Sequence, residues 1–96
     1  MPSRKIPRPF AMHWGSGQIV EEASFEGEHT QPAIQLMRFD DGEAAGSLSI
    51  RFCHFNHRGQ FQRSPMILGE TEIDALREAV ACTPELQRLL LRIAGG

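Results

Sequence analysis

Residues 47–80 read SLSIRFCHFNHRGQFQRSPMILGETEIDALREAV, and this stretch decides the fold. Side chains alternate in character over residues 47–55, as they do on a strand with one buried face. One face carries Leu48, Ile50 and Phe52, and the other carries Ser49, Arg51, Cys53 and Phe55. The remaining residues predict a tight turn, a returning strand and an amphipathic helix in direct succession, the helix having Ile73, Leu76 and Val80 as its apolar stripe.

The turn of this hairpin is Asn-His-Arg-Gly at residues 56–59. Asn suits the first position of a type I turn, and Gly59 in the fourth can adopt a positive φ, so the pattern predicts a three-residue loop with a bulge. This register sets two pairs on one face, Phe55 opposite Phe61 and Cys53 opposite Arg63. A loop one residue different would move Phe61 and Arg63 to the other face, because side chains along a strand have a period of two.

Two strands are expected before the hairpin. The first covers residues 18–25, and its shared face carries Ile19, Ala23 and Phe25. The second covers residues 33–39, with Ile34 and Leu36 on one face and Met37 and Phe39 on the other. Turn-forming residues separate these strands from each other and from the hairpin.

The returning strand of the hairpin, residues 60–68, contains Pro65. Proline cannot donate to a ladder, so this strand is expected at an edge or with a bulge. Thr83 followed by Pro84 is typical of an N-cap and a first helical position, which breaks the C-terminal helix. The predicted fold class is therefore α+β: a four-stranded antiparallel meander followed by a C-terminal helix broken near Thr83.

Composition predicts one globular domain, residues 18–96, preceded by a basic Pro/Gly-rich arm, residues 1–17. Of the 96 residues, 41% are hydrophobic and 23% are charged, which is too apolar for a disordered chain. We expect no membrane contact, because no run of about 18 apolar residues exists. The N-terminus lacks the apolar stretch of a secretory signal, and the two cysteines sit on different elements, so we expect reduced thiols in a cytoplasm.

A chain this short buries only about 60–65% of its unfolded surface, so its stability gains from association. Its C-terminal helices also carry more apolar surface than is needed to cover one face of a four-stranded sheet. We therefore expect a homodimer that forms through the C-terminal helices.

Charge is segregated along the chain, whose net charge is −2. Residues 1–17 hold three cations and no acid, residues 18–46 hold seven acids and one arginine, and residues 47–68 hold three arginines and no acid. Residues 69–96, with five acids and three arginines, complete the total. A polyanion would therefore have to meet the arm and the hairpin.

The hairpin face combines cations with aromatic rings. Guanidinium groups neutralise phosphates and aromatic faces accept stacked bases of any sequence, which is how single-strand binders work. Arg38, Arg51, Arg58 and Arg63 would meet phosphates, and Phe39, Phe55 and Phe61 would offer stacking surfaces. The alternative is an ordinary solvated sheet face whose phenylalanines contact another subunit.

Metal binding and catalysis find little support in the sequence. Cys53 and His54 point to opposite faces of one strand, so they cannot share an ion without distortion. Nothing places a histidine and an orienting acid beside Cys53 or Cys82. We expect neither an enzyme nor a bound cofactor.

The order of elements over residues 33–80 resembles the single-stranded-DNA-binding transcriptional coactivator family, positive cofactor four and its bacterial and whirly-type relatives. The segments LSIRFCHFNHRGQFQ and PMILGETEIDALREAV are similar to the family's central hairpin and to its last strand and helix start. The resemblance implies a curved antiparallel sheet backed by a dimerising helix, with sheet ribbons that hold unpaired DNA. It also places Arg51 and Arg63 near DNA-contacting basic residues and Phe39 near a stacking aromatic.

The function expected from the sequence is sequence-tolerant binding of single-stranded DNA or RNA by a homodimer, in a role related to transcription. The rival expectation is a small homodimeric protein-interaction or structural module without nucleic-acid binding, since a fold does not fix a function. Arginines that pair with neighbouring acids instead of sharing one open face would favour the rival.

Overall fold

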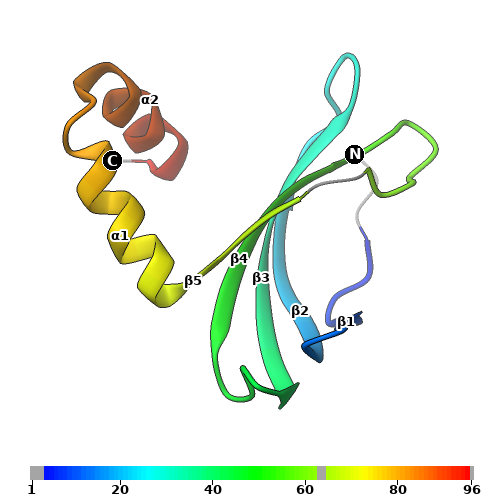
Figure 1. The fold of residues 1–96 in the computed structure, drawn as a ribbon. Helices are drawn as coiled ribbons and strands as arrows, with labels where there is room; N and C mark the ends of the chain where they lie inside the picture. Colours follow the sequence, from blue (N-terminus) through cyan, green and yellow to red (C-terminus); the bar gives the residue numbers. More distant parts are fainter. Residues whose placement is uncertain (1–3, 63–64, 96) are drawn as a thin grey trace.

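Five antiparallel strands follow one another as a meander, in the order β1-β2-β3-β4-β5, and two helices complete the chain (Figure 1). The strands are β1 (Arg8–Met12), β2 (Gly15–Ser24), β3 (Gln31–Gly42), β4 (Leu48–Phe55) and β5 (Met66–Gly69). The computed structural model describes residues 4–62 and 65–95. The α+β class and the meander are confirmed, but the sheet has five strands where the sequence predicted four.

The strand that the sequence missed is β1, which lies within the expected N-terminal arm. It pairs with β2 so that Phe10 stands opposite Gly17. Pro7 and Pro9 obscured this strand because proline is rare in sheet interiors; β1 tolerates Pro9 because it is an edge strand.

A bulge in β2 reverses part of the expected pattern of faces. The register shifts between Ile19 and Glu21, so Ile19 stands opposite Met37 whereas Ala23 stands opposite Ile34. Since neighbouring residues of β3 alternate between faces, Ile19 and Ala23 lie on opposite faces, and the prediction that they share one is wrong. The bulge thereby brings Glu22 onto the face of Ile19.

The hairpin turn pairs Phe55 with Phe61 as predicted, whereas the predicted partner of Cys53, Arg63, lies outside the described residues. Phe55 and Phe61 form a bridge across it, and Gly59 has a φ of +81°. The Asn56 side-chain oxygen accepts hydrogen bonds from the backbone N–H groups of Arg58 and Gln60, each at 2.9 Å, which holds the loop. The returning strand is shorter than expected, since β5 begins at Met66, and it forms the sheet edge that Pro65 indicated.

The two faces of the sheet differ in what covers them. On one face Ile19, Met37 and Phe39 form the buried core, against which the β1 residues Phe10 and Met12 pack. Polar residues of the same face, Gln31 and Gln35 of β3, are also buried. The opposite face carries the apolar residues of β3 and β4 that the sequence separated from these, namely Ile34, Leu36, Ile50 and Phe52.

The helices begin directly at the end of β5 and extend away from the sheet (Figure 1). They are α1 (Glu70–Val80) and α2 (Pro84–Ala94), with Thr83 as the N-cap of α2, so the predicted break is confirmed. None of their residues, all within the described part of the chain, is buried. Neither helix combines the length and the apolar composition that crossing a membrane requires.

Candidate nucleic-acid interface

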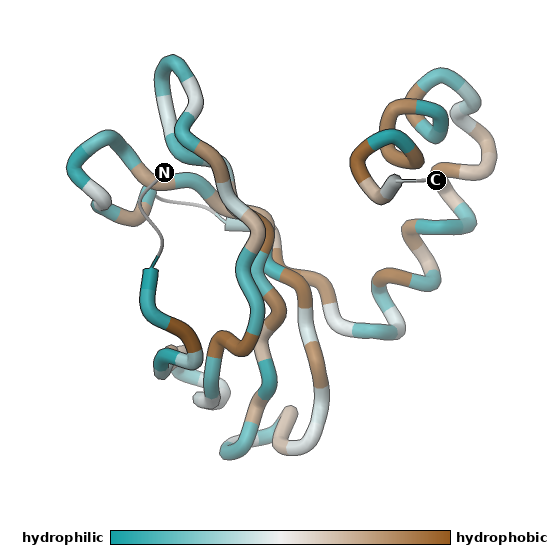
Figure 2. The backbone as a smooth tube through the Cα atoms, turned by 180° about the vertical axis from the view of Figure 1, so that it is seen from behind, coloured by the Kyte–Doolittle hydropathy of each residue, from teal (hydrophilic) through white to brown (hydrophobic). Residues whose placement is uncertain are grey.

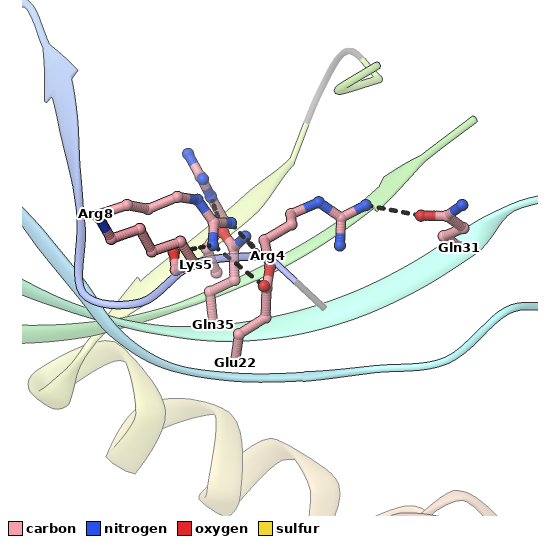
Figure 3. A network of polar contacts seen from close by, with 7 residues as sticks. Arg4, Lys5, Arg8, Glu22, Gln31 and Gln35 are labelled. Carbon is pink, nitrogen blue, oxygen red and sulfur yellow. Dashed lines mark hydrogen bonds and ion pairs between the residues drawn. The ribbon is translucent and has the colours of Figure 1, made fainter. Parts of the chain in front are cut away.

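The N-terminal segment lies against the same sheet face as the core and brings cations to it (Figure 3). Arg8 forms a two-pronged ion pair with Glu22, with Nη2 2.9 Å from Oε2 and Nη1 3.2 Å from Oε1. The Glu22 side chain is only 5% exposed, so this pair is largely removed from solvent. Arg8 also donates to the Lys5 carbonyl, which ties the segment before β1 to the pair.

Gln35 connects this ion pair to the hairpin. Its amide nitrogen donates to Glu22 Oε2 at 2.6 Å, and its amide oxygen accepts from Arg51 Nε at 2.6 Å. A single hydrogen-bonded path therefore runs from Arg8 on β1 through Glu22 and Gln35 to Arg51 on β4. Buried polar groups that are joined in this way hold one another in place.

Two arginines also lie over aromatic rings. The Arg4 guanidinium carbon is 3.5 Å from the centroid of the Phe55 ring, and that of Arg51 is 4.7 Å from the Phe61 ring. Both distances are within the range of a cation–π contact. The two rings meet edge to face at 5.5 Å, so the arm and the hairpin form one cluster of guanidinium groups and phenylalanines.

The cluster carries more positive than negative charge. The charges of Arg4 and Arg8 act on Glu22, and the charge of Glu22 acts on Arg51, so three guanidinium groups surround this carboxylate in the described part of the chain. Exposed Lys5 adds a fourth cation beside them. The cluster defined by Arg4, Lys5, Arg8, Arg51, Phe55 and Phe61 is called the cationic cluster below.

One donor of the cationic cluster lacks an acceptor. Arg4 Nη2 donates to the Gln31 side-chain oxygen at 2.7 Å, whereas Arg4 Nη1 is buried and has no hydrogen-bond acceptor among the described residues. A buried charged donor without an acceptor is costly. An anion beside the cluster would balance its excess charge.

Comparison of the chain with protein-family models, curated proteins and solved structures gives no match. The cluster must therefore be interpreted from its own geometry.

Burial shifts the pKa of Arg51 in the cluster and of Cys53 beside it. Burial lowers the pKa of Arg51, which remains a cation at any physiological pH. Burial, with the charge of Glu22, raises the pKa of Cys53 against the opposing effect of Arg51. Cys53 is thus a neutral thiol at neutral pH, and a thiol is a poor nucleophile and a poor metal ligand. Within the described residues, no group of three or more histidines, cysteines or acids is placed to hold a metal ion.

The structure brings together some of the residues that the sequence proposed for nucleic-acid contact. Arg51, Phe55 and Phe61 share the face of the cationic cluster, and Phe61 is 43% exposed. Arg58 is exposed at the hairpin tip. Phe55, Phe61 and Arg58 lie at the hairpin end of the sheet, and Arg51 lies in the middle of β4, with its guanidinium over the Phe61 ring.

The other proposed residues lie elsewhere. Phe39 is 2% exposed, with its ring edge to face against Phe10 at 5.0 Å, so it has no open ring for a base. Arg38 is exposed but stands opposite Leu48, on the face away from Arg51. Arg63 lies outside the described residues.

Sequence reasoning missed the arm and the carboxylate that organise the cluster. The sequence predicts no position for Arg4 and Arg8 within the basic arm, and Glu22 is only one of the seven acids of residues 18–46. The bulge that brings Glu22 onto this face has no clear signal in the sequence. A buried Gln35 between Ala33 and Met37 was the available sign, because a glutamine on an otherwise apolar strand face requires polar partners.

Protonation of Glu22 should destabilise the fold. Burial raises its pKa, but hydrogen bonds from Arg8 and Gln35 and the charges of Arg8 and Arg4 together lower it below the ordinary value of 4.5. A lowered pKa in the folded state gives stability above the unfolded value, and this stability is lost as the pH falls through the folded pKa. We expect Glu22→Gln to lower the free energy of unfolding by about 1–3 kcal/mol at pH 7 and by less at pH 3.

Urea denaturation followed by circular dichroism at both pH values measures this difference. Glu21→Gln is the matched control, because Glu21 is the exposed neighbour of Glu22 and stands opposite Leu36, on the other face. Equal costs of Glu22→Gln at pH 7 and pH 3 would contradict the role of the Glu22 charge.

Proposed function

We propose that this protein is a cytoplasmic, homodimeric binder of single-stranded nucleic acid that tolerates many sequences, with a role related to transcription. The observation that carries the proposal is the cationic cluster: three guanidinium groups and Lys5 gather with two phenylalanines around the carboxylate of Glu22. This combination offers charge to phosphates and a ring to a base, which are the two needs of a single-strand binder. The exposed Phe61 ring, next to Arg51, is the surface on which a base would stack.

The proposed contacts differ in part from those expected at first. Arg51, Phe61 and Arg58 of the hairpin and Arg4, Lys5 and Arg8 of the N-terminal segment form the surface. Phe55 lies beneath Arg4 and supports it. Arg38 is left out because it lies on the opposite face of the sheet, and Phe39 is left out because its ring is buried.

A salt titration tests this function. With about four phosphate contacts, affinity for a labelled oligonucleotide of about 20 thymidines should fall with added salt at a log–log slope near −3. A mixed-sequence strand should bind within a few-fold of it, since stacking and charge read no sequence. Fluorescence anisotropy measures both, and no binding at low salt would refute the proposal.

Arg51→Gln should weaken that binding about 5- to 10-fold and make the slope less steep by about 1. The matched control is Arg77→Gln, which removes the same charge from the exposed surface of α1. Equal losses from both variants would show that net charge alone, and not the cationic cluster, determines binding.

A second candidate function follows from the internal partners of the arginines. Arg8 is paired with Glu22 and Arg51 is bonded to Gln35, so both are already engaged in stabilising the sheet. This observation favours a homodimeric structural or protein-interaction module. Such a module would dimerise through its C-terminal helices yet leave the oligonucleotide unbound in low salt. Both functions predict a dimer, so the salt titration is the measurement that separates them.

A further inference from the structure

The face of the sheet away from the cationic cluster is apolar and lies open. Ile34 and Leu36 of β3 stand beside Phe52 and Ile50 of β4, and the pairing continues to Leu68 of β5. Phe52 is exposed, and the others are only partly covered. An apolar groove of about 460 Å³ lies on this face next to the end of α2 and includes Phe52 and Ile93 in its walls.

The helix α2 carries an apolar stripe that is equally uncovered. Leu86, Leu89, Leu90 and Ile93 recur at helical spacing, and all are exposed, Ile93 at 70%. Figure 2 shows hydrophobic segments along this helix, which lies beside the sheet and not on it. A helix with such a stripe is stable in water only when another surface covers it.

The surface area indicates how much must be covered. The chain exposes 7012 Å², whereas a folded monomer of 10.7 kDa exposes about 5,500 Å². Its radius of gyration is 14.4 Å, against about 12.5 Å for a compact domain of this length. Each chain thus exposes about 1,500 Å² more than a compact monomer. Two chains would bury about 3,000 Å² together, which is within the range of obligate homodimers.

This chain's own α2 borders the groove through Ile93 but leaves the face open. Gly69 ends β5 and caps α1 without a linker, and its backbone N–H donates to Glu72 Oε1 at 3.0 Å. This capping interaction starts α1 directly at the end of β5. The helices and the apolar face therefore diverge from Gly69 (Figure 1).

A second copy of the chain offers both surfaces that are needed. We propose that α2 of each chain packs on the apolar sheet face of the other, so that the two chains exchange their helices about a two-fold axis. Such a contact is self-complementary and closed, which limits assembly to a dimer. The proposal rests on the homodimer proposed above, but it names the sheet face as the surface that receives the helix.

Complementation between two variants tests the exchange. Leu89→Glu damages only the helix side and Ile50→Glu only the sheet side, so each variant alone should be monomeric by sedimentation equilibrium at a concentration where the wild type is dimeric. In an equimolar mixture, the intact helix of one variant meets the intact sheet of the other, and mixed dimers should form. Arg88→Gln, on the polar side of α2, changes the charge by the same one unit, so it is the matched control and should stay dimeric.

The outcomes distinguish failure of the homodimer from failure of the helix exchange. A monomeric wild type at micromolar concentration contradicts the homodimer itself. If the wild type is dimeric but the variants do not complement, the exchange is contradicted. The homodimer then stands, formed by contact between the helices only.

A second measurement covers variants that do not fold. Isotope-filtered NMR on a mixture of labelled and unlabelled wild-type chains should show contacts from Leu89 or Ile93 to the Phe52 ring between chains. Their absence in a dimer overturns the exchange.

Discussion

Replacing Met37 by alanine is expected to lower the free energy of unfolding by about 2–5 kcal/mol, because truncation leaves a cavity as well as losing buried surface. Met37 is 0% exposed, and it lies with Ile19 and Phe39 in the buried core cluster. A domain of this size has a total stability of about 5–15 kcal/mol, so the variant should be marginally folded. The buried core cluster consists of Ile19, Met37 and Phe39, so the loss of one of these side chains removes a large part of it.

Urea denaturation of this variant at a fixed protein concentration measures the loss, since the stability of a dimer depends on concentration. Met37→Leu is the matched control and should cost less than about 1.5 kcal/mol, because it preserves the volume. Similar losses from Met37→Ala and Met37→Leu would show that the buried volume at this position is not what stabilises the sheet.

Replacing Gly17 by alanine should be comparably damaging, for a different reason. A Cβ atom at Gly17 would overlap the Arg38 carbonyl oxygen and lie 2.8 Å from the Phe39 Cα. Both are backbone atoms, so β2 and β3 would have to separate where Gly17 pairs with Phe39. We expect a loss of about 3 kcal/mol or more, at the upper end of the cost of overpacking.

Gly69→Ala is the matched control for this prediction. A Cβ atom there would meet only ordinary contacts, at 3.7 Å from Glu72 Oε1 and 3.8 Å from Ser49 Oγ. It should cost at most about 1 kcal/mol, the difference between glycine and alanine as an N-cap. Thermal unfolding of both variants checks the contrast, and a Gly17→Ala protein as stable as Gly69→Ala would contradict the close approach of the two strands.

The sequence predicted those parts of the fold that depend on local chemistry. The turn at Asn56 and Gly59 specified the hairpin register, because only one loop length places the positive φ at glycine. Alternation in β3 separated Ile34 from Met37 correctly, since both faces have a clear apolar residue. Pro84 ended the first helix for steric reasons that need no tertiary context.

Features that depend on tertiary pairing were not predictable in the same way. The bulge between Ile19 and Glu21 is fixed by pairing with β3. Every residue that follows it in β2 therefore lies on the face opposite to the one that simple alternation from Ile19 predicts. The edge strand β1 is formed by a proline-containing segment whose own propensity argues against it.

The candidate site was predictable only in its hairpin half. Arg51, Phe55 and Phe61 were identified because alternation and turn type decide their face. Arg4 joins these residues because it lies over the Phe55 ring. The two residues are far apart in the sequence, and no local pattern predicts their contact. The charge segregation of the arm and the hairpin was the indirect sign that these segments have a common role.

The central claim is that nucleic acid meets the cationic cluster, and NMR mapping tests it most directly. Single-stranded oligothymidine is added at low salt to the ¹⁵N-labelled protein, and backbone amide and arginine Nε–Hε signals are followed. We expect the largest shifts at Arg51 and at the amides of Arg8 and Phe61, with α1 and α2 unchanged. Shifts confined to the helices or the apolar sheet face, or no shifts at all, would contradict the account.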